Sequence, residues 1–243
     1  MTVLGLSGTV VGLFAALVLL GGLVQSTVGL GVGLVFSPVL ALVDPGLVPT
    51  LPLCMSVLTP VTTLLWEHRG IDWSVVRWAL GARLLGTAAG VWVVVHVSTT
   101  VIAAGLGAMV LIAVAASLVS VRIPDNRTTR SAAGLVAGVT GTATSISGPP
   151  IALVLQHRDP ARLRPTLAVF FGAGAVASLV GLAAGGGVDL RTLELAGVLA
   201  PFVVLGVWGG TRLRVRAARA RLRLGLLGVC ACTATALLVR TLA

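Results

Sequence analysis

Two glycine-rich stretches interrupt long apolar runs of this chain, and both contain residue types suited to holding a small anion. They cover residues 22–38 and 134–150 and match without a gap at a spacing of 112 positions (134 minus 22). Glycine lets a ligand approach the backbone closely, and a helix that breaks inside a membrane leaves unpaired N–H groups and a positive dipole end there. Breaks at matching places in two halves are typical of a transporter whose site lies at the breaks.

The candidate substrate-binding residues are therefore the glycines and small polar residues of these stretches. From the first stretch they are Gln25, Ser26, Thr27, Gly29, Gly31, Gly33 and Ser37, and from the second Thr140, Gly141, Thr142, Thr144, Ser145 and Ser147. Each hydroxyl also has the alternative of bonding a carbonyl of its own helix. Arg164, at the start of a later apolar run, either draws anions inward or anchors its span.

The composition places these stretches in an all-α, polytopic helical membrane protein. Of 243 residues, 57% are hydrophobic and 10% are charged, whereas a soluble domain carries about 25% charged residues. The charges cluster between apolar runs of spanning length, and polar residues do not alternate as they do in a transmembrane β-barrel. The net charge of +10 does not indicate nucleic-acid binding, because the basic residues flank spans. The three cysteines are expected to be small buried residues.

Two apolar runs, 3–43 and 131–156, are expected to enter the membrane and return as broken, re-entrant hairpins. The first is too long for one span of about 20 residues, and the second contains several glycines and a proline pair. With 131–156 as a hairpin, nearly all arginines fall on one side of the membrane, as the positive-inside rule favours. Each half then has one hairpin and three spans, an odd number of crossings. This predicts two inverted repeats, 1–121 and 132–243, joined by a cytoplasmic linker loop at 122–131.

Two further features concern the spans themselves. Gly86 and Gly90 correspond to Gly206 and Gly210, and such pairs one helical turn apart favour close helix packing. Arg83 lies a little over one turn inside the apolar run 78–95, so we expect its side chain to snorkel to the interface.

The order and spacing of three motifs resembles the sulfite exporter TauE/SafE-type membrane transporter family over nearly the whole chain. The motifs are Gly29-Leu30-Gly31-Val32-Gly33 with Pro38, His68-Arg69-Gly70-Ile71-Asp72-Trp73, and Arg164-Pro165-Thr166-Leu167-Ala168-Val169-Phe170-Phe171. The resemblance implies a transporter of small anions, especially sulfur oxyanions or organosulfonates, and adds Ser56 as a candidate site residue. Val32 stands where the family usually has glycine, and hydroxyl residues replace glycines in the second stretch.

These observations predict a secondary transporter in the cytoplasmic membrane, with basic loops cytoplasmic and both termini external. Its partners would be a small anionic substrate and the lipid bilayer. No ATP-binding loop is present, and the acidic residues lie in loops or near span ends, which favours export driven by the membrane potential and the substrate gradient. We expect no cofactor, no metal site and no enzymatic activity, because no buried acid, base or ligand cluster is visible. The alternative is a non-transporting integral membrane subunit or scaffold.

Overall fold

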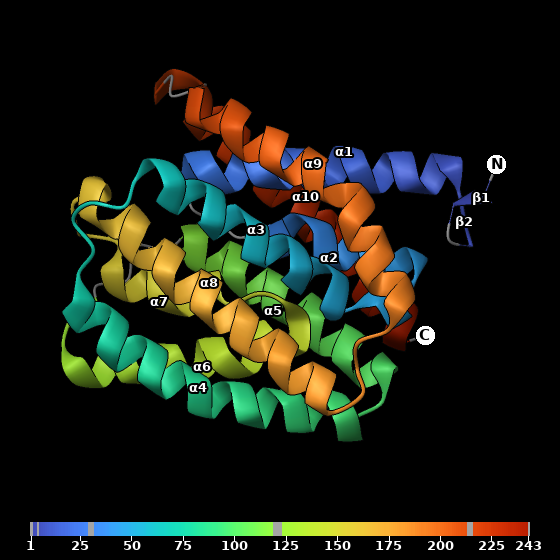
Figure 1. The fold of residues 1–243 in the computed structure, drawn as a ribbon, viewed down its shortest axis with the longest axis horizontal. Helices are drawn as coiled ribbons and strands as arrows, with labels where there is room; N and C mark the ends of the chain where they lie inside the picture. Colours follow the sequence, from blue (N-terminus) through green and yellow to red (C-terminus); the bar gives the residue numbers. More distant parts are fainter. Residues whose placement is uncertain (1, 4, 29–31, 119–122, 213–215, 243) are drawn as a thin grey trace.

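The computed structural model describes all residues except 1, 4, 29–31, 119–122, 213–215 and 243. The described chain begins with a minimal antiparallel β-hairpin of β1 (Thr2–Val3) and β2 (Leu6–Ser7) and is otherwise helical (Figure 1). The first half contains α1 (Gly8–Val28), α2 (Val32–Val43), the 3-10 helix η1 (Pro45–Leu47), α3 (Thr50–Trp66), α4 (Trp73–His96) and α5 (Thr99–Leu118). The second half contains α6 (Arg127–Thr144), α7 (Gly148–Leu155), α8 (Pro160–Ala184), α9 (Leu190–Arg212) and α10 (Arg216–Leu242).

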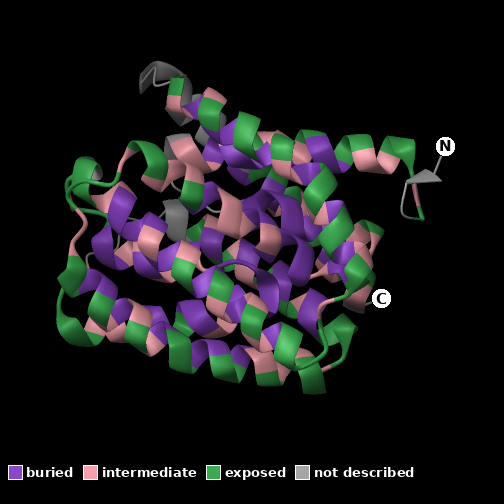
Figure 2. Ribbon diagram, in the orientation of Figure 1, coloured by how far each residue is buried: buried purple, intermediate pink, exposed green. Residues whose placement is uncertain are grey.

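Several helices have the length and composition of membrane spans, which confirms the predicted all-α, polytopic helical membrane fold. Among the described residues, four segments are long and apolar enough to cross a membrane, namely Gly8–Ser26, Trp73–His96, Ala161–Ala184 and Leu190–Arg212. Their outward faces remain apolar: Leu85 is 70% exposed and Trp92 is 61% exposed. Figure 2 shows such exposed residues along the outer helices and the buried ones gathered between the helices. A lipid environment stabilises this arrangement, whereas water does not.

The first interrupted run forms a hairpin of α1 and α2, and the second forms a hairpin of α6 and α7. Each hairpin returns to the end of the molecule at which it begins. A Cβ on Gly5, before α1, would lie 3.8 Å from Nη2 of Arg191. The same guanidinium pairs with Asp44, after α2, at 3.1 Å. For the second run, Asp125 before α6 pairs with Arg158 after α7 at 2.5 Å.

The two hairpins open toward opposite ends. Arg158 also pairs with Asp72, the N-cap residue of α4, whose side chain accepts from the amides of Ser74 and Val75. Helix α4 runs from there across the molecule. At the other end, Thr50 Oγ1 donates to the carbonyl of Gly187 at 3.0 Å, just before α9. The N- and C-termini lie at this second end (Figure 1).

Each hairpin packs mainly on the other half, α1 against α9 and α6 against α4. The glycines make this approach possible, because a Cβ on Gly86 would overlap the carbonyl of Leu135, and one on Gly206 would overlap that of Leu19. The close packing predicted for these glycine pairs is therefore confirmed.

The packing corrects the number of residues that separates equivalent positions of the two glycine-rich stretches. A Cβ on Gly22 would lie 2.8 Å from the carbonyl oxygen of Val203, and one on Gly138 would overlap the carbonyl of Arg83. Val203 follows Arg83 by the same 120 positions (203 minus 83) that separate Gly206 from Gly86. Gly22 is thus equivalent to Gly138, 116 positions away (138 minus 22), and the sequence match at 112 is one helical turn out of register. Glycines recur about every turn in this stretch, so it matches itself almost equally well after such a slip.

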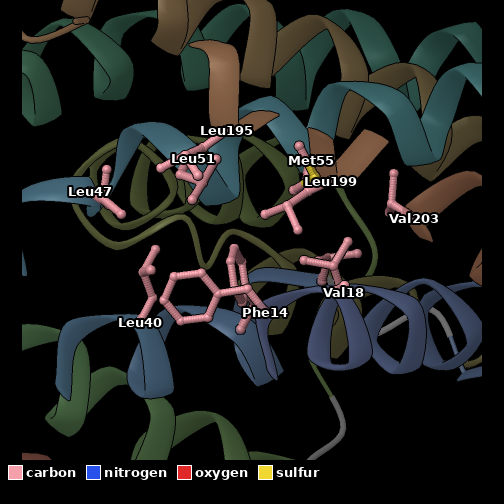
Figure 3. Close-up of a cluster of buried hydrophobic side chains, with 12 residues drawn as sticks. Phe14, Val18, Leu40, Leu47, Leu51, Met55, Leu195, Leu199 and Val203 are labelled. Carbon is pink, nitrogen blue, oxygen red and sulfur yellow. The ribbon is translucent and has the colours of Figure 1, made fainter. Parts of the chain in front are cut away.

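Buried aliphatic and aromatic side chains fill the contacts between hairpins and spans. In the cluster of Figure 3, Phe14 of α1 packs edge-on against Phe36 of α2, with ring centroids 5.5 Å apart. Leu199 of α9 and Met55 of α3 belong to the same cluster. This core ties the first hairpin to both halves and thereby holds the start of α2 in place.

Candidate functional site

A small cavity lies where the start of α2, the break between α6 and α7, and helices α3, α4 and α8 meet. It is lined by Gln25, Leu34, Leu53, Ser56, Arg83, Ser145, Ile146, Ser147, Gly148, Pro149, Phe171 and Ala175. The space open to the centre of a water molecule is about 20 Å³, enough for about one ordered water. Its lining combines polar side chains with leucine, isoleucine, phenylalanine and alanine side chains.

The start of α2 and the end of α6 touch each other beside this cavity. A Cβ on Gly33, in the first turn of α2, would overlap the carbonyl oxygen of Ser145 at the end of α6. Ser145 has a left-handed backbone, with φ at 61°, and its Oγ donates to the carbonyl of Pro49 at 2.8 Å. Gly33 is therefore needed for the contact between the two breaks, and it leaves no room there for a ligand.

Side chains satisfy part of the backbone that the breaks release. The amide of Val32, the first residue of α2, donates to Oε1 of Gln25 at 2.7 Å. Thr140 Oγ1 donates to the carbonyl of Ile146 at 2.9 Å. The side chain of Ser147, which precedes α7, caps no amide of that helix. Because prolines at 149 and 150 have no N–H group, the first turn of α7 offers few backbone donors.

The one charged residue in the described lining of the cavity is Arg83, whose side chain was expected to snorkel to the interface. That expectation is wrong, because Arg83 is only 1% exposed and lines the cavity. The helix begins at Trp73, capped by Asp72, five residues before the apolar run that marked the span. Arg83 thus lies ten residues into a 24-residue helix, about 15 Å from its start, too deep for its side chain to reach the interface.

The Arg83 guanidinium is held by aromatic and backbone contacts. Nη1 donates to the carbonyl of Phe170 at 3.0 Å, and Cζ lies 4.6 Å from the centroid of the Phe170 ring. Nε is buried without a hydrogen-bond partner. The group lies flat on Gly174, where a Cβ would overlap Nε and Cζ. None of the seven carboxylates of the chain, all within the described residues, forms an ion pair with it.

Arginine remains charged in proteins, and a charge buried in a membrane segment marks a functional position unless it is paired. Here the cation has a ring face and one carbonyl but no counter-charge. The arrangement is chemically suited to an anion that enters the cavity.

Of the predicted site residues that the structure describes, four line the cavity and the rest lie elsewhere. The four are Gln25, Ser56, Ser145 and Ser147. Several hydroxyls bond their own helices or a neighbour instead: Ser26 donates to Leu23, Thr144 to Thr140, and Thr142 pairs with Ser178. Ser37 is buried without a partner, and Gly33 and Gly141 are packing positions. Gly29, Gly31 and the side chain of Thr27 lie outside the described residues.

Arg164 lies apart from the cavity, with Nη1 3.7 Å from Oε1 of Glu67. The cysteines form no disulfide; Cys230 is buried and Cys54 is partly buried, whereas Cys232 is exposed, contrary to expectation.

A charged cluster joins three loops at the end where the second hairpin opens. Arg158 pairs with Asp72 and Asp125, and Arg130 pairs with Asp125 at 2.6 Å. Burial alone would raise the pKa of Asp125, but hydrogen bonds from both arginines and their charges hold that pKa below its ordinary value. Burial alone would also raise the pKa of Asp72. The charge and hydrogen bond of Arg158, together with hydrogen bonds from two backbone amides, outweigh this effect and lower the pKa below its ordinary value. Both carboxylates are therefore charged at neutral pH and hold the loops together.

Broken apolar hairpins, long spans and a buried cation together define a helical membrane protein of the transporter class. The family model for Sulfite exporter TauE/SafE matches residues 13–237, and the chain belongs to this family. The resemblance seen in the sequence motifs is thereby confirmed. No curated protein and no solved structure matches the chain.

Proposed function

We propose that this protein is a secondary transporter that exports small anions, such as sulfite or organosulfonates, across the cytoplasmic membrane. The observation that carries the proposal is the buried, uncompensated guanidinium of Arg83 in a cavity between the two halves. A buried charge without a partner is costly, and an anion that binds there supplies the missing partner. Family membership supports the same substrate class.

The remaining polar groups of the cavity suit an oxyanion. The hydroxyls of Ser56 and Ser147 and the amide group of Gln25 are neutral donors that line the cavity together with the guanidinium. Charge-assisted hydrogen bonds from a guanidinium are about twice as strong as neutral ones. In this arrangement Arg83 supplies the binding energy, while the neutral donors orient the oxygens.

The two halves are proposed to act as inverted repeats that rock around this cavity. The hairpins open toward opposite ends, and each packs on a span of the other half, so movement of one half changes access at both ends. The end that carries the Arg158 cluster is assigned to the cytoplasm, because Arg69, Arg77, Arg127 and Arg130 also lie in or beside the loops there.

Membrane potential is sufficient to drive such export. An anion that leaves a cell with a negative interior gains about 2.3 kcal/mol per charge for each 100 mV. No described acidic residue lines the cavity, so the proposal includes no proton relay.

Reconstitution in liposomes tests the proposal. Vesicles loaded with radiolabelled methanesulfonate or sulfite are clamped with a potassium gradient and valinomycin. We expect efflux above that of loaded vesicles without the protein, and we expect this efflux to increase when the interior is made negative. The variant Arg83→Gln should lower the methanesulfonate flux at least tenfold, and Arg191→Gln, at the end of the molecule, is the matched control. Wild-type efflux equal to that of loaded vesicles without the protein, or efflux that does not change with voltage, would contradict the proposal.

A further inference from the structure

Among the described residues, a single ionisable side chain lines the cavity. Of its described lining residues only Arg83 carries a charge, and the others are neutral polar or apolar. Arg164 pairs with Glu67, and Arg158 pairs with Asp72 and Asp125. These pairs involve loops and helix ends, so no second cation joins Arg83 in the lining.

We infer that this cavity selects its substrate by valence, taking a monoanion and excluding a dianion of the same size; the inference rests on the proposed function. A monoanion beside Arg83 makes the loaded cavity neutral. A dianion leaves one negative charge uncompensated within a membrane interior, which proteins avoid because the charge loses its hydration and gains no partner.

The shape of the lining favours the same class of substrate. Arg83, Ser56 and Ser147 offer hydrogen-bond donors, while Leu34, Leu53, Phe171 and Ala175 offer apolar contacts. An alkylsulfonate has three oxygens for the donors and a carbon group for the apolar side chains. Sulfate has an oxygen at every corner, so an oxygen that met an apolar side chain would lack a hydrogen bond.

Sulfite provides an internal test, because it titrates near neutral pH between the monovalent hydrogensulfite ion and the divalent sulfite ion. If only the monoanion is carried, flux at fixed total sulfite falls about tenfold per pH unit on the alkaline side of this titration. Methanesulfonate remains monovalent and sulfate divalent over the same range. These two ions are close in size, since one methyl group replaces one oxygen, and they serve as matched probes.

The experiment measures efflux of methanesulfonate, sulfate and total sulfite from proteoliposomes between pH 6 and pH 9, with the potential clamped at zero. We expect methanesulfonate flux to be level with pH and at least ten times the sulfate flux, and sulfite flux to decline as the solution becomes alkaline. Sulfate flux within twofold of methanesulfonate, or sulfite flux level with pH, overturns the valence inference and leaves the proposed function intact. Absence of flux for all three ions overturns both.

Variants of Arg83 provide a second test of the inference. Arg83→Lys keeps the charge, so we expect it to keep a methanesulfonate preference of at least tenfold even where total flux falls. Arg83→Gln removes the charge and should bring the ratio of the two fluxes close to one. Arg191→Gln removes a cation outside the cavity and should leave the ratio at the wild-type value. A Gln variant that retains the full ratio overturns the inference.

Discussion

The most direct perturbation of the cavity that keeps Arg83 itself but shifts its guanidinium is Gly174→Ala. The glycine lies under the guanidinium of Arg83, and an added methyl group would overlap Nε and Cζ and lie 2.6 Å from Nη1. An ordinary contact between such atoms is about 3.4 Å or longer, so Nη1 must move by about 0.8 Å (3.4 minus 2.6) and the centre of the group by more. The backbone of α8 cannot yield as easily, because α8 packs against both α3 and α4.

This displacement has two expected costs. The hydrogen bond from Nη1 to the carbonyl of Phe170, now 3.0 Å long, is stretched or lost, and hydrogen bonds to charged groups contribute about 1.5–3 kcal/mol. Overpacking of a filled interior costs about 1–3 kcal/mol of stability. For binding, a misplacement of about 1 Å in a positioned group can reduce function by about 100-fold. We therefore expect the KM for methanesulfonate to rise at least tenfold in Gly174→Ala.

The assay compares concentration-dependent methanesulfonate efflux for wild type, Gly174→Ala and Gly81→Ala, together with the thermal unfolding of each in detergent. Gly81 belongs to the same helix as Arg83, and a Cβ there meets nothing within 4 Å. This control should unfold at the wild-type temperature or slightly above it, because alanine favours helix by about 1 kcal/mol over glycine. If Gly174→Ala transports with wild-type KM, the position of the Arg83 guanidinium does not determine anion binding, and the reasoning fails.

Three further outcomes are expected. Gly138→Ala should lower the unfolding temperature, with a loss of about 1–3 kcal/mol from overpacking against α4, whereas Gly105→Ala, with open space around it, should not; equal effects in a detergent melt would contradict the packing. Asp125→Asn should lower the free energy of unfolding by about 1 kcal/mol at pH 7. Because the pKa of Asp125 is lowered in the folded protein, this stabilisation is present above the ordinary aspartate pKa of about 3.9 and is lost as the pH falls through the folded value. The unfolding temperatures of wild type and variant should therefore converge in acid. Ser145→Val should destabilise more than Ser145→Ala, because a β-branched residue resists the positive φ of 61°; the reverse order of unfolding temperatures would refute this.

Local chemistry determined much of this protein before any tertiary structure was considered. Apolar runs with few charges specify membrane helices, and a glycine-rich stretch followed by proline specifies a break, because both properties depend only on neighbouring residues. The distribution of arginines between loops favoured a hairpin for 131–156, and a hairpin for 3–43 was expected only by analogy with it. Three motifs were sufficient to identify the family.

Packing between distant segments decided the rest. The burial of Arg83 depends on where α4 begins and which face meets α6 and α8, and an apolar window that omitted residues 73–77 could not show either. The equivalence of Gly22 with Gly138 rests on contacts with α9 and α4, since the glycine periodicity alone allows a slip of one turn. The selection of Ser56 and Ser147 for the cavity, and of Thr142 and Thr144 for internal hydrogen bonds, follows from side-chain direction on each helix. Sequence therefore determined which segments enter the membrane and where they break, whereas only the tertiary structure decided which side chains face one another, because that depends on contacts between residues far apart in the chain.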